Sequence, residues 1–386
     1  MHSTQQRRVN RWRTAATVLL LLGAFCPEAR ADTVRSQQWY LDAMRADEMW
    51  KTSTGAGVTV AVVDSGVADV PDLRGQVLEG RDFTGQPGSA RTDIDGHGTR
   101  MALFIAGTGQ GDGSFGLAPG VKILPLRASA DQDFASGSRA VASAIRYAAD
   151  SNAKVINISL ASAGQSPEED EAVRYAVSKG KLIFAGVGNT GDKGNLVQYP
   201  AATPGVVGVA AVDRQIKATS WSQHGPQVDL AAPGADMVAP CTDGSPGLCT
   251  GDGTSDSTAL ASASAALLWS VHPEWTANQV LRVLINTAGG PKSGEKRSDS
   301  IGYGVVRPRV ALQSPGDPGP PDVSPLPESV APVTRETAAP PGARTKRATG
   351  LVSSSATPIA AGAVIACIAL AVGAGVAVSR RRRRNG

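Results

Sequence analysis

Four short segments carry side chains that could together perform nucleophilic catalysis: Asp64 in VVDSGV, His97 in DGHGT, Asn189 in GNTG and Ser255 in GTS. A serine hydroxyl becomes a nucleophile when an imidazole takes its proton, and a carboxylate can orient that imidazole. An amide N–H can stabilise the oxyanion that forms on the attacked carbonyl. The set predicts acyl transfer through a serine ester, which requires no metal and no cofactor.

Each of these residues also has a simpler interpretation when it is taken alone. Asp64 could form a turn after a strand, His97 could cap a helix, and Ser255 could be an ordinary N-cap of the small-residue stretch 251–269. Of the histidines that remain after a leader is removed, His224 lies in a polar loop and His272 precedes a proline. Only His97 lies between two glycines, where its ring can be approached from several sides.

These side chains need a scaffold, and the apolar pattern predicts one. Continuous apolar runs indicate buried strands at 58–63, 121–126, 154–160, 182–185 and 206–212. Helices are predicted at 138–149, at 166–178 with Ser166 as N-cap and Pro167 in the first turn, and at 276–288 with Thr276 as cap. Buried strands that alternate with helices favour a parallel, doubly wound α/β sheet, whose functional groups gather at the carboxyl ends of the strands.

The order Asp64, His97, Asn189, Ser255 resembles that of the subtilisin-like serine proteases, the subtilase family, over about residues 55–312. The resemblance implies a three-layer α/β/α fold with a mainly parallel sheet. It assigns Asp64, His97 and Ser255 to a catalytic triad, and Asn189 with the Ser255 N–H to an oxyanion hole. It also assigns Ser159, Leu160 and Ala161 to a strand that pairs with the substrate backbone, although Ala161 stands where glycine is usual.

The residues after Ser255 depart from the family pattern of an apolar residue, two alanines and a Pro-His pair. Here Asp256, Ser257 and Thr258 come first, and Ala259-Leu260 replace the Pro-His pair. A carboxylate in the first turn suits the helix dipole. We also expect Asp256 to disfavour acidic substrate residues near the scissile bond, and the other serines of this helix to serve in packing.

Both ends of the chain read as targeting segments. Arginines precede an apolar run that ends in Ala29-Arg30-Ala31, which is typical of a signal peptide, whereas Cys26 as a lipidation site lacks the small residue normally needed before it. A second apolar run is long enough to cross a membrane, and five arginines follow it. The predicted organisation is a signal peptide at 1–31, an N-terminal arm at 32–56, the protease domain at 57–312, a Pro-rich disordered stalk at 313–356, a transmembrane helix at 357–378 and a basic cytoplasmic tail at 379–386.

Charge and cysteines agree with export. Without the ten arginines and one glutamate of residues 1–31 and 379–386, the chain has 28 positive and 33 negative side chains, so nothing indicates nucleic-acid binding. Cys241 and Cys249 lie eight positions apart in a Gly/Pro/Asp loop and are expected to form a disulfide in an oxidising compartment. A zinc site is the alternative, but no second cysteine or histidine pair accompanies them.

The short arm, the Pro-rich stalk and the single C-terminal anchor resemble the mycosins, membrane-anchored proteases associated with type VII secretion. The resemblance implies a single-pass membrane endopeptidase with an extracellular catalytic domain, protein or peptide substrates, lipid contact through the C-terminal helix, and association with a secretion complex. Two alternatives stay open: a scaffold that stabilises such a complex with little proteolysis, and a surface protease with no dedicated partner.

Overall fold

The computed structural model describes residues 33–111, 113–129, 138–242 and 245–327. All of them belong to one compact unit, Met1–Ala331, and a second unit, Pro332–Gly386, lies beyond them. The predicted signal peptide (1–31), transmembrane helix (357–378) and basic tail (379–386) therefore fall outside the described residues. Within the described ranges, no helix has both the length and the apolar character needed to cross a membrane.

A seven-stranded sheet forms the centre of the unit, and every neighbouring pair of its strands is parallel. The strand order is β2-β3-β1-β4-β5-β6-β7. A separate antiparallel hairpin pairs β8 with β9. The strands are β1 Thr59–Asp64, β2 Arg81–Asp82, β3 Lys122–Arg127, β4 Val155–Ile158, β5 Leu182–Gly186, β6 Val206–Val212, β7 Leu230–Pro233, β8 Met237–Pro240 and β9 Leu248–Gly251.

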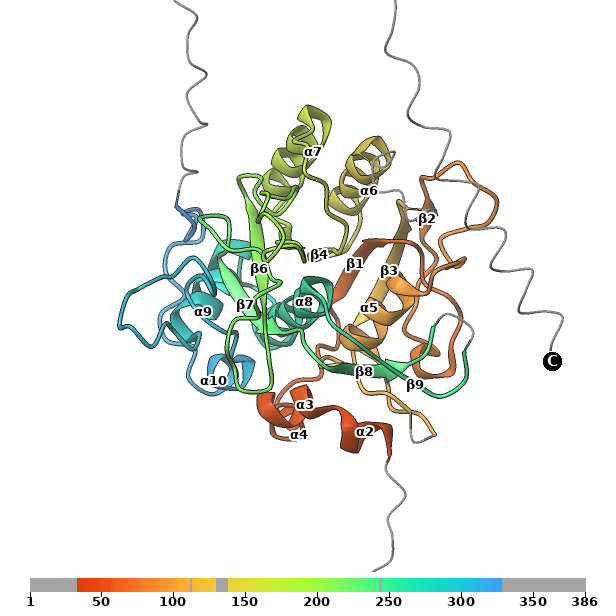
Figure 1. Cartoon of the computed structure of the whole chain (residues 1–386), viewed down its shortest axis with the longest axis horizontal. Coiled ribbons are helices and arrows are strands. Elements are labelled where there is room, and N and C mark those ends of the chain that lie inside the picture. The colour runs from red at the N-terminus through yellow and green to blue at the C-terminus, as the bar shows by residue number, and fades with distance from the viewer. Residues whose placement is uncertain (1–32, 112, 130–137, 243–244, 328–386) are drawn as a thin grey trace, which may run out of the picture. The chain divides into compact units, whose positions relative to one another are not determined.

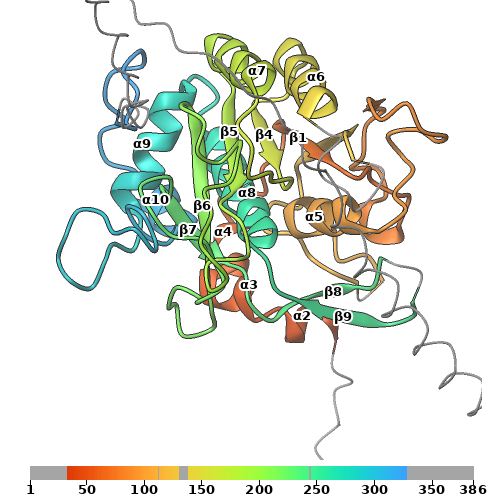
Figure 2. The ribbon, with the colours of Figure 1, turned by 45° about the horizontal axis from the view of Figure 1, so that its top comes forward.

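Helices cover both faces of this sheet. Figures 1 and 2 show α6 and α7 on one face and α5 and α8 on the other. The arrangement confirms the predicted three-layer α/β/α fold with a mainly parallel sheet. The helices are α2 Val34–Gln37, α3 Trp39–Met44, α4 Ala46–Met49, the 3-10 turn η1 Pro71–Leu73, α5 His97–Ala106, α6 Ser138–Asp150, α7 Pro167–Ser178, α8 Thr254–Val271, α9 Ala277–Thr287 and α10 Pro308–Gln313.

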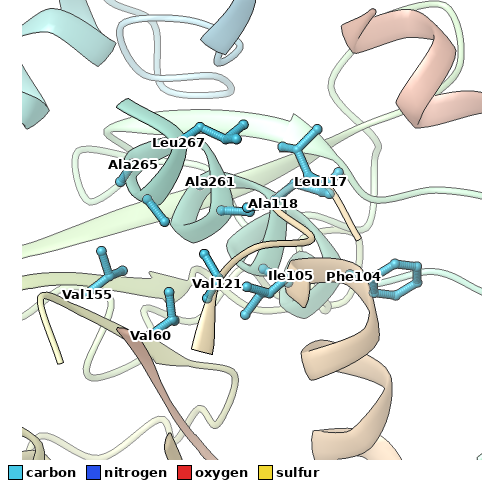
Figure 3. Packing of buried hydrophobic residues seen from close by; sticks show 14 of the residues in the cluster. Val60, Phe104, Ile105, Leu117, Ala118, Val121, Val155, Ala261, Ala265 and Leu267 are labelled. Carbon is cyan, nitrogen blue, oxygen red and sulfur yellow. The ribbon is translucent and has the colours of Figure 1, made fainter. Parts of the chain in front are cut away.

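Helix α8 lies against the sheet along most of its length. Small side chains let it approach closely, and Figure 3 shows Ala261 and Ala265 near Val60 of β1 and Val155 of β4. Ser257, Ser262 and Ser264 are fully buried, and each hydroxyl has an acceptor, as we expected of packing residues. Ser257 donates to Ala232 O at 3.0 Å, Ser262 to Asn157 Oδ1 at 3.0 Å and Ser264 to Leu260 O at 2.7 Å.

The N-terminal arm packs on the domain. Leu41 and Met44 are buried in the core that α5 and α8 share, and Trp39 and Trp50 pack against it. Gln38 is also buried; its Nε2 donates to Phe115 O at 2.7 Å, and its Oε1 accepts from Phe115 N at 3.0 Å. Helices α3 and α4 therefore complete the core of the described unit.

The first part of the predicted stalk differs from the expectation of an unpacked segment. Residues 317–323, which we call the strap, lie against α9. Arg282 Nη1 donates to Pro318 O at 2.6 Å and to Pro320 O at 3.1 Å, and Gln279 Nε2 donates to Gly319 O at 3.0 Å. The prediction of an unpacked segment failed here. The strap has no core of its own, but side chains of the neighbouring helix α9 donate hydrogen bonds to its proline and glycine carbonyls.

Candidate active site

Asp64 ends strand β1, at the carboxyl edge of the sheet, and is fully buried. Its Oδ1 accepts from Ser65 N at 2.8 Å and from Ser65 Oγ at 3.2 Å, and it lies 2.7 Å from Nδ1 of His97. An ionised carboxylate only accepts hydrogen bonds, so Nδ1 of His97 carries the proton. When the ring is neutral, this tautomer leaves Nε2 available to accept a proton from a nucleophile.

Two glycines position His97 at the first residue of α5. Gly96, the N-cap, has a φ of 77°, which favours glycine. At Gly98, a Cβ atom would lie 2.1 Å from Gly66 O, so only glycine lets α5 approach the loop after β1 this closely. Gly98 N donates to Ser65 Oγ at 2.9 Å, so Ser65 contacts both Asp64 and the helix that presents His97.

The electrostatic environment of His97 favours its protonated form. Burial lowers the pKa of His97, but the charge of the Asp64 carboxylate and its hydrogen bond outweigh burial and raise the pKa to about 9, with a smaller contribution from Asp256. The imidazole side chain keeps 37% of its surface exposed, so the ring is open on one side. The ring is thus fixed by Asp64 and accessible from the cavity.

Ser255 is the second residue of α8 and faces a cavity of about 310 Å³ that His97 also lines. Its Oγ donates to Ser159 O at 3.5 Å, and no hydrogen bond among the described residues joins it to His97. Catalytic hydrogen bonds are often long in an unliganded site and shorten when substrate binds. The structure therefore brings Ser255 and His97 to one cavity without a direct bond between them.

Asn189 lies near the N-terminus of α8. Its Oδ1 accepts from Thr254 N at 2.9 Å and from Thr254 Oγ1 at 3.0 Å. A Cβ atom built on Gly253 would lie 3.8 Å from Asn189 Nδ2 and 3.9 Å from Ser255 Cβ, so both side chains lie beside Gly253. Sequence reasoning missed Thr254, although its place between Gly253 and Ser255 could have marked it as the residue that orients Asn189.

The predicted substrate-binding residues Ser159, Leu160 and Ala161 line the same cavity. Polar residues that we did not predict also line it, among them Gln223, whose Oε1 accepts from Thr190 N at 2.9 Å. No sequence signal separated Gln223 from other loop residues. The full lining is His97, Ser159, Leu160, Ala161, Gly186, Gly188, Asn189, Thr190, Gln198, Gln223, Thr254 and Ser255.

Asp256 follows Ser255 on α8 but does not line its cavity. Its side chain is almost fully buried and pairs with Arg100 of α5, with Oδ2 3.1 Å from Nη2, while Ser255 faces the cavity. An effect of Asp256 on acidic substrate residues would therefore act through its charge and not through contact, and it stays a prediction. Burial raises the pKa of Asp256 to about 6, against the opposing effects of Arg100 and His97.

Cys241 and Cys249 form a disulfide, with Cα atoms 4.9 Å apart, that links β9 to the residue after β8. The hairpin approaches the loop before His97, because a Cβ atom on Gly96 would lie 2.3 Å from Thr242 O. In the described ranges, no three His, Cys, Asp or Glu side chains gather in a way that could hold a metal ion.

The chain belongs to the subtilase family, to which residues 55–304 match. Among curated proteins, Mycosin-1 of Mycobacterium tuberculosis is 34% identical over 325 residues, which cover 70% of this chain and 72% of that protein. A thermostable alkaline protease of Halalkalibacterium halodurans is 35% identical over 234 residues, or 61% of this chain. The match spans 63% of that protease, which is less than two thirds of its length.

Solved structures show the same likeness. A crystal structure of MycP1 from the ESX-1 type VII secretion system superposes with a TM-score of 0.67 at 30% identity, covering 78% of this chain and 91% of that one. A chain in the periplasmic assembly of the ESX-5 inner membrane complex superposes with a TM-score of 0.64 at 28% identity, covering 83% and 92%. The protein is thus similar to mycosins along most of its described length.

Proposed function

We propose that the protein is a serine endopeptidase that hydrolyses peptide bonds with Asp64, His97 and Ser255 as its catalytic triad. The observation that carries the proposal is the 2.7 Å contact between Asp64 and His97 at a cavity that Ser255 and Asn189 also line. Membership of the subtilase family supports the same reaction class. Substrates are protein or peptide chains that pass through this cavity beside Ser159, Leu160 and Ala161.

In this mechanism His97 Nε2 takes the proton of Ser255 Oγ as the oxygen attacks the scissile carbonyl carbon. The carbonyl oxygen becomes negative and accepts hydrogen bonds from Asn189 Nδ2 and from the N–H of Ser255. His97 then gives its proton to the leaving amine, which departs and leaves an acyl ester on Ser255. Water, activated by the same imidazole, hydrolyses the ester, and Asp64 stabilises the charged ring in both halves of the reaction.

The geometry explains how each group is prepared for its step. Thr254 holds Asn189 Oδ1, so the amide presents Nδ2 rather than its oxygen to the developing charge. The N-terminus of α8 adds a partial positive charge at the same place. In subtilisin, the loss of the corresponding side-chain donor lowers kcat by about 10²–10³.

We further propose that a C-terminal helix at 357–378 anchors the protein in a membrane, with the catalytic domain outside and residues 379–386 in the cytoplasm. The apolar run and the arginines that follow it support this topology. The likeness to a chain of the ESX-5 inner membrane assembly supports a role beside a type VII secretion complex. That likeness also favours the second candidate, a scaffold of such a complex. The residues after Ser255 depart from the family pattern, and this departure is the reason to expect little proteolysis from a scaffold.

Reaction with a membrane-impermeant fluorophosphonate tests function and location together. Added to intact cells that express the full chain, the probe is expected to label the wild type, and Ser255→Ala is expected to lose the label because the nucleophile is gone. In subtilisin, removal of the serine costs about 10⁶ in kcat.

The control is Ser257→Ala, which removes a buried packing hydroxyl two residues away. Equal labelling of the wild type and Ser255→Ala would refute the assigned nucleophile, and no labelling of folded wild type in lysed cells would leave the scaffold function. Labelling in lysed cells alone would contradict the outward orientation.

A further inference from the structure

A buried ion pair connects the two helices that carry the proposed nucleophile and base. Arg100 lies on α5, three residues after His97, and Asp256 lies on α8, directly after Ser255. Their closest side-chain atoms are 3.1 Å apart, and the side chains keep only 17% and 4% of their surface exposed. A displacement of either residue therefore moves a helix turn that carries one of the reacting groups.

The guanidinium of Arg100 also holds the hairpin that packs beside the site. Its Nη2 donates to Met237 O of β8 at 3.0 Å, and its carbon lies 5.2 Å from the ring centroid of Phe104 on its own helix. At Gly251 of β9, a Cβ atom would lie 2.6 Å from Nη1, so the glycine leaves room for the arginine. Arg100 thus joins α5, α8 and the β8–β9 hairpin.

Stability alone does not account for an ion pair at this place. Removing two charges from water is costly, and replacing a buried pair with apolar residues of similar volume is often neutral or stabilising. What a hydrogen-bonded charge pair adds is a defined separation and orientation of the two helices.

That separation matters because no hydrogen bond among the described residues holds Ser255 to His97. Their distance is set by the packing of α5 against α8, and a misplacement of about 1 Å at a reacting centre can cost about 10² in rate. Asp256 and His97 also interact electrostatically. Asp256 raises the pKa of His97, and His97 lowers the pKa of Asp256. The other charged or titratable groups that face Asp256 are Arg100, Asp252 and Tyr40.

We propose that Arg100 and Asp256 are a positioning pair, which fixes the helix of His97 against the helix of Ser255 and places a second carboxylate near the imidazolium formed in the reaction. The inference rests on the proposed protease function. Arg100 and Asp256 do not contact substrate in this role; they act through His97 and Ser255.

The test uses the full chain, purified, in four forms: wild type, Asp256→Asn, Arg100→Met and the double variant Arg100→Met/Asp256→Leu. Two quantities are measured for each form, the melting temperature and the second-order rate of fluorophosphonate labelling as a function of pH. Arg100→Met leaves a buried carboxylate without its partner and is expected to melt lower. The double variant replaces both charges with apolar groups and is expected to recover the melting temperature.

Labelling separates positioning from mere stability. The double variant is expected to label about 10²-fold more slowly than the wild type even where its melting temperature is recovered. In Asp256→Asn and in the double variant, the pH of half-maximal labelling is expected to move to lower pH, because a charge that raises the pKa of His97 is gone. A purely structural pair would not move this midpoint.

Arg146→Met/Glu171→Leu, which removes a more exposed interhelical ion pair, is the control. Arg146 and Glu171 form an ion pair with a 2.9 Å contact between α6 and α7, on the other face of the sheet, and its removal is expected to change neither labelling rate nor midpoint. A folded Asp256→Asn or double variant that labels with the rate and midpoint of the wild type overturns the proposal. If the double variant does not fold, Asp256→Asn decides. A wild type that is not labelled contradicts the protease function instead, so the two failures are distinguishable.

Discussion

In the proposed mechanism His97 acts as a base, but its resting imidazole is in the wrong protonation state for that step at neutral pH. Burial lowers its pKa, but Asp64 and then Asp256 raise it to about 9, so His97 carries a proton at pH 7. A protonated imidazole cannot take the proton of Ser255. The same carboxylate that orients the ring and stabilises it after proton transfer therefore reduces the fraction of enzyme that is ready to react at neutral pH.

The pH profile follows from the sign of this shift. Because the reactive form of His97 is neutral, kcat/KM for a peptide substrate is expected to rise from pH 7 through the pKa of about 9, by about tenfold per pH unit well below the pKa, and to level off about one pH unit above it. Initial rates over about pH 6–11 at constant ionic strength measure this rise. A profile that is flat from pH 7 upward would contradict the raised pKa.

Single helices show how local chemistry fixes the boundaries of an element. Helix α7 begins after Ser166, whose Oγ accepts from Glu169 N at 3.3 Å, and Pro167 occupies its first position. Helix α9 begins after Thr276 with a capping box to Gln279. Both caps were predicted and are confirmed, because a cap depends on residues only three positions apart.

Loss of the α7 cap should weaken the fold without touching the site. Ser166→Ala leaves Glu169 N without its acceptor, so we expect a free energy of unfolding lower by about 1 kcal/mol, measured by denaturant titration. Ser166→Thr keeps the hydroxyl and is expected to lose less. An alanine variant as stable as the wild type would show that the cap contributes nothing here.

Sequence patterns predicted the strands that consist of continuous apolar runs, and β6 was predicted with the bounds that it has in the structure. They did not predict β7, whose four residues Leu230–Pro233 include no β-branched side chain, or the β8–β9 hairpin. At the site, short motifs led to Asp64, His97 and Ser255. The pair of Arg100 and Asp256 could not be predicted, because no local pattern records a contact across 156 residues.

At the scale of the whole described unit, helix α9 holds the strap near the C-terminal end of the unit. Arg282 of α9 donates to Pro318, Pro320 and Val323 of the strap, and Thr276 Oγ1 donates to Pro321 O at 2.9 Å. Donors on α9 therefore fix a segment that has few apolar contacts of its own. Composition alone predicted an unpacked stalk from residue 313. A high proline content indicates that a segment has no core of its own, but it does not show whether a neighbouring helix supplies hydrogen-bond donors to that segment.

Release of the strap should expose it to proteases. Arg282→Ala removes the donor side chain that contacts three of its carbonyls, so we expect limited proteolysis by an added protease to cut near residues 314–327 faster than in the wild type. Arg309→Ala is the control, since it removes an arginine of α10 whose side chain, among the described residues, donates a hydrogen bond to Gln313 and not to the strap. Equal cleavage rates in both variants would contradict a specific role of Arg282.

The N-terminal arm is synthesised early, but its hydrogen-bond partners lie far along the chain. Tyr40 donates to Val238 O across 198 residues, and Ser53 donates to Leu267 O across 214. A ribosome therefore makes the arm long before these partners exist, and Tyr40 and Ser53 lack their native acceptors until β8 and α8 have been synthesised. Final closure of the core waits until most of the chain has been made.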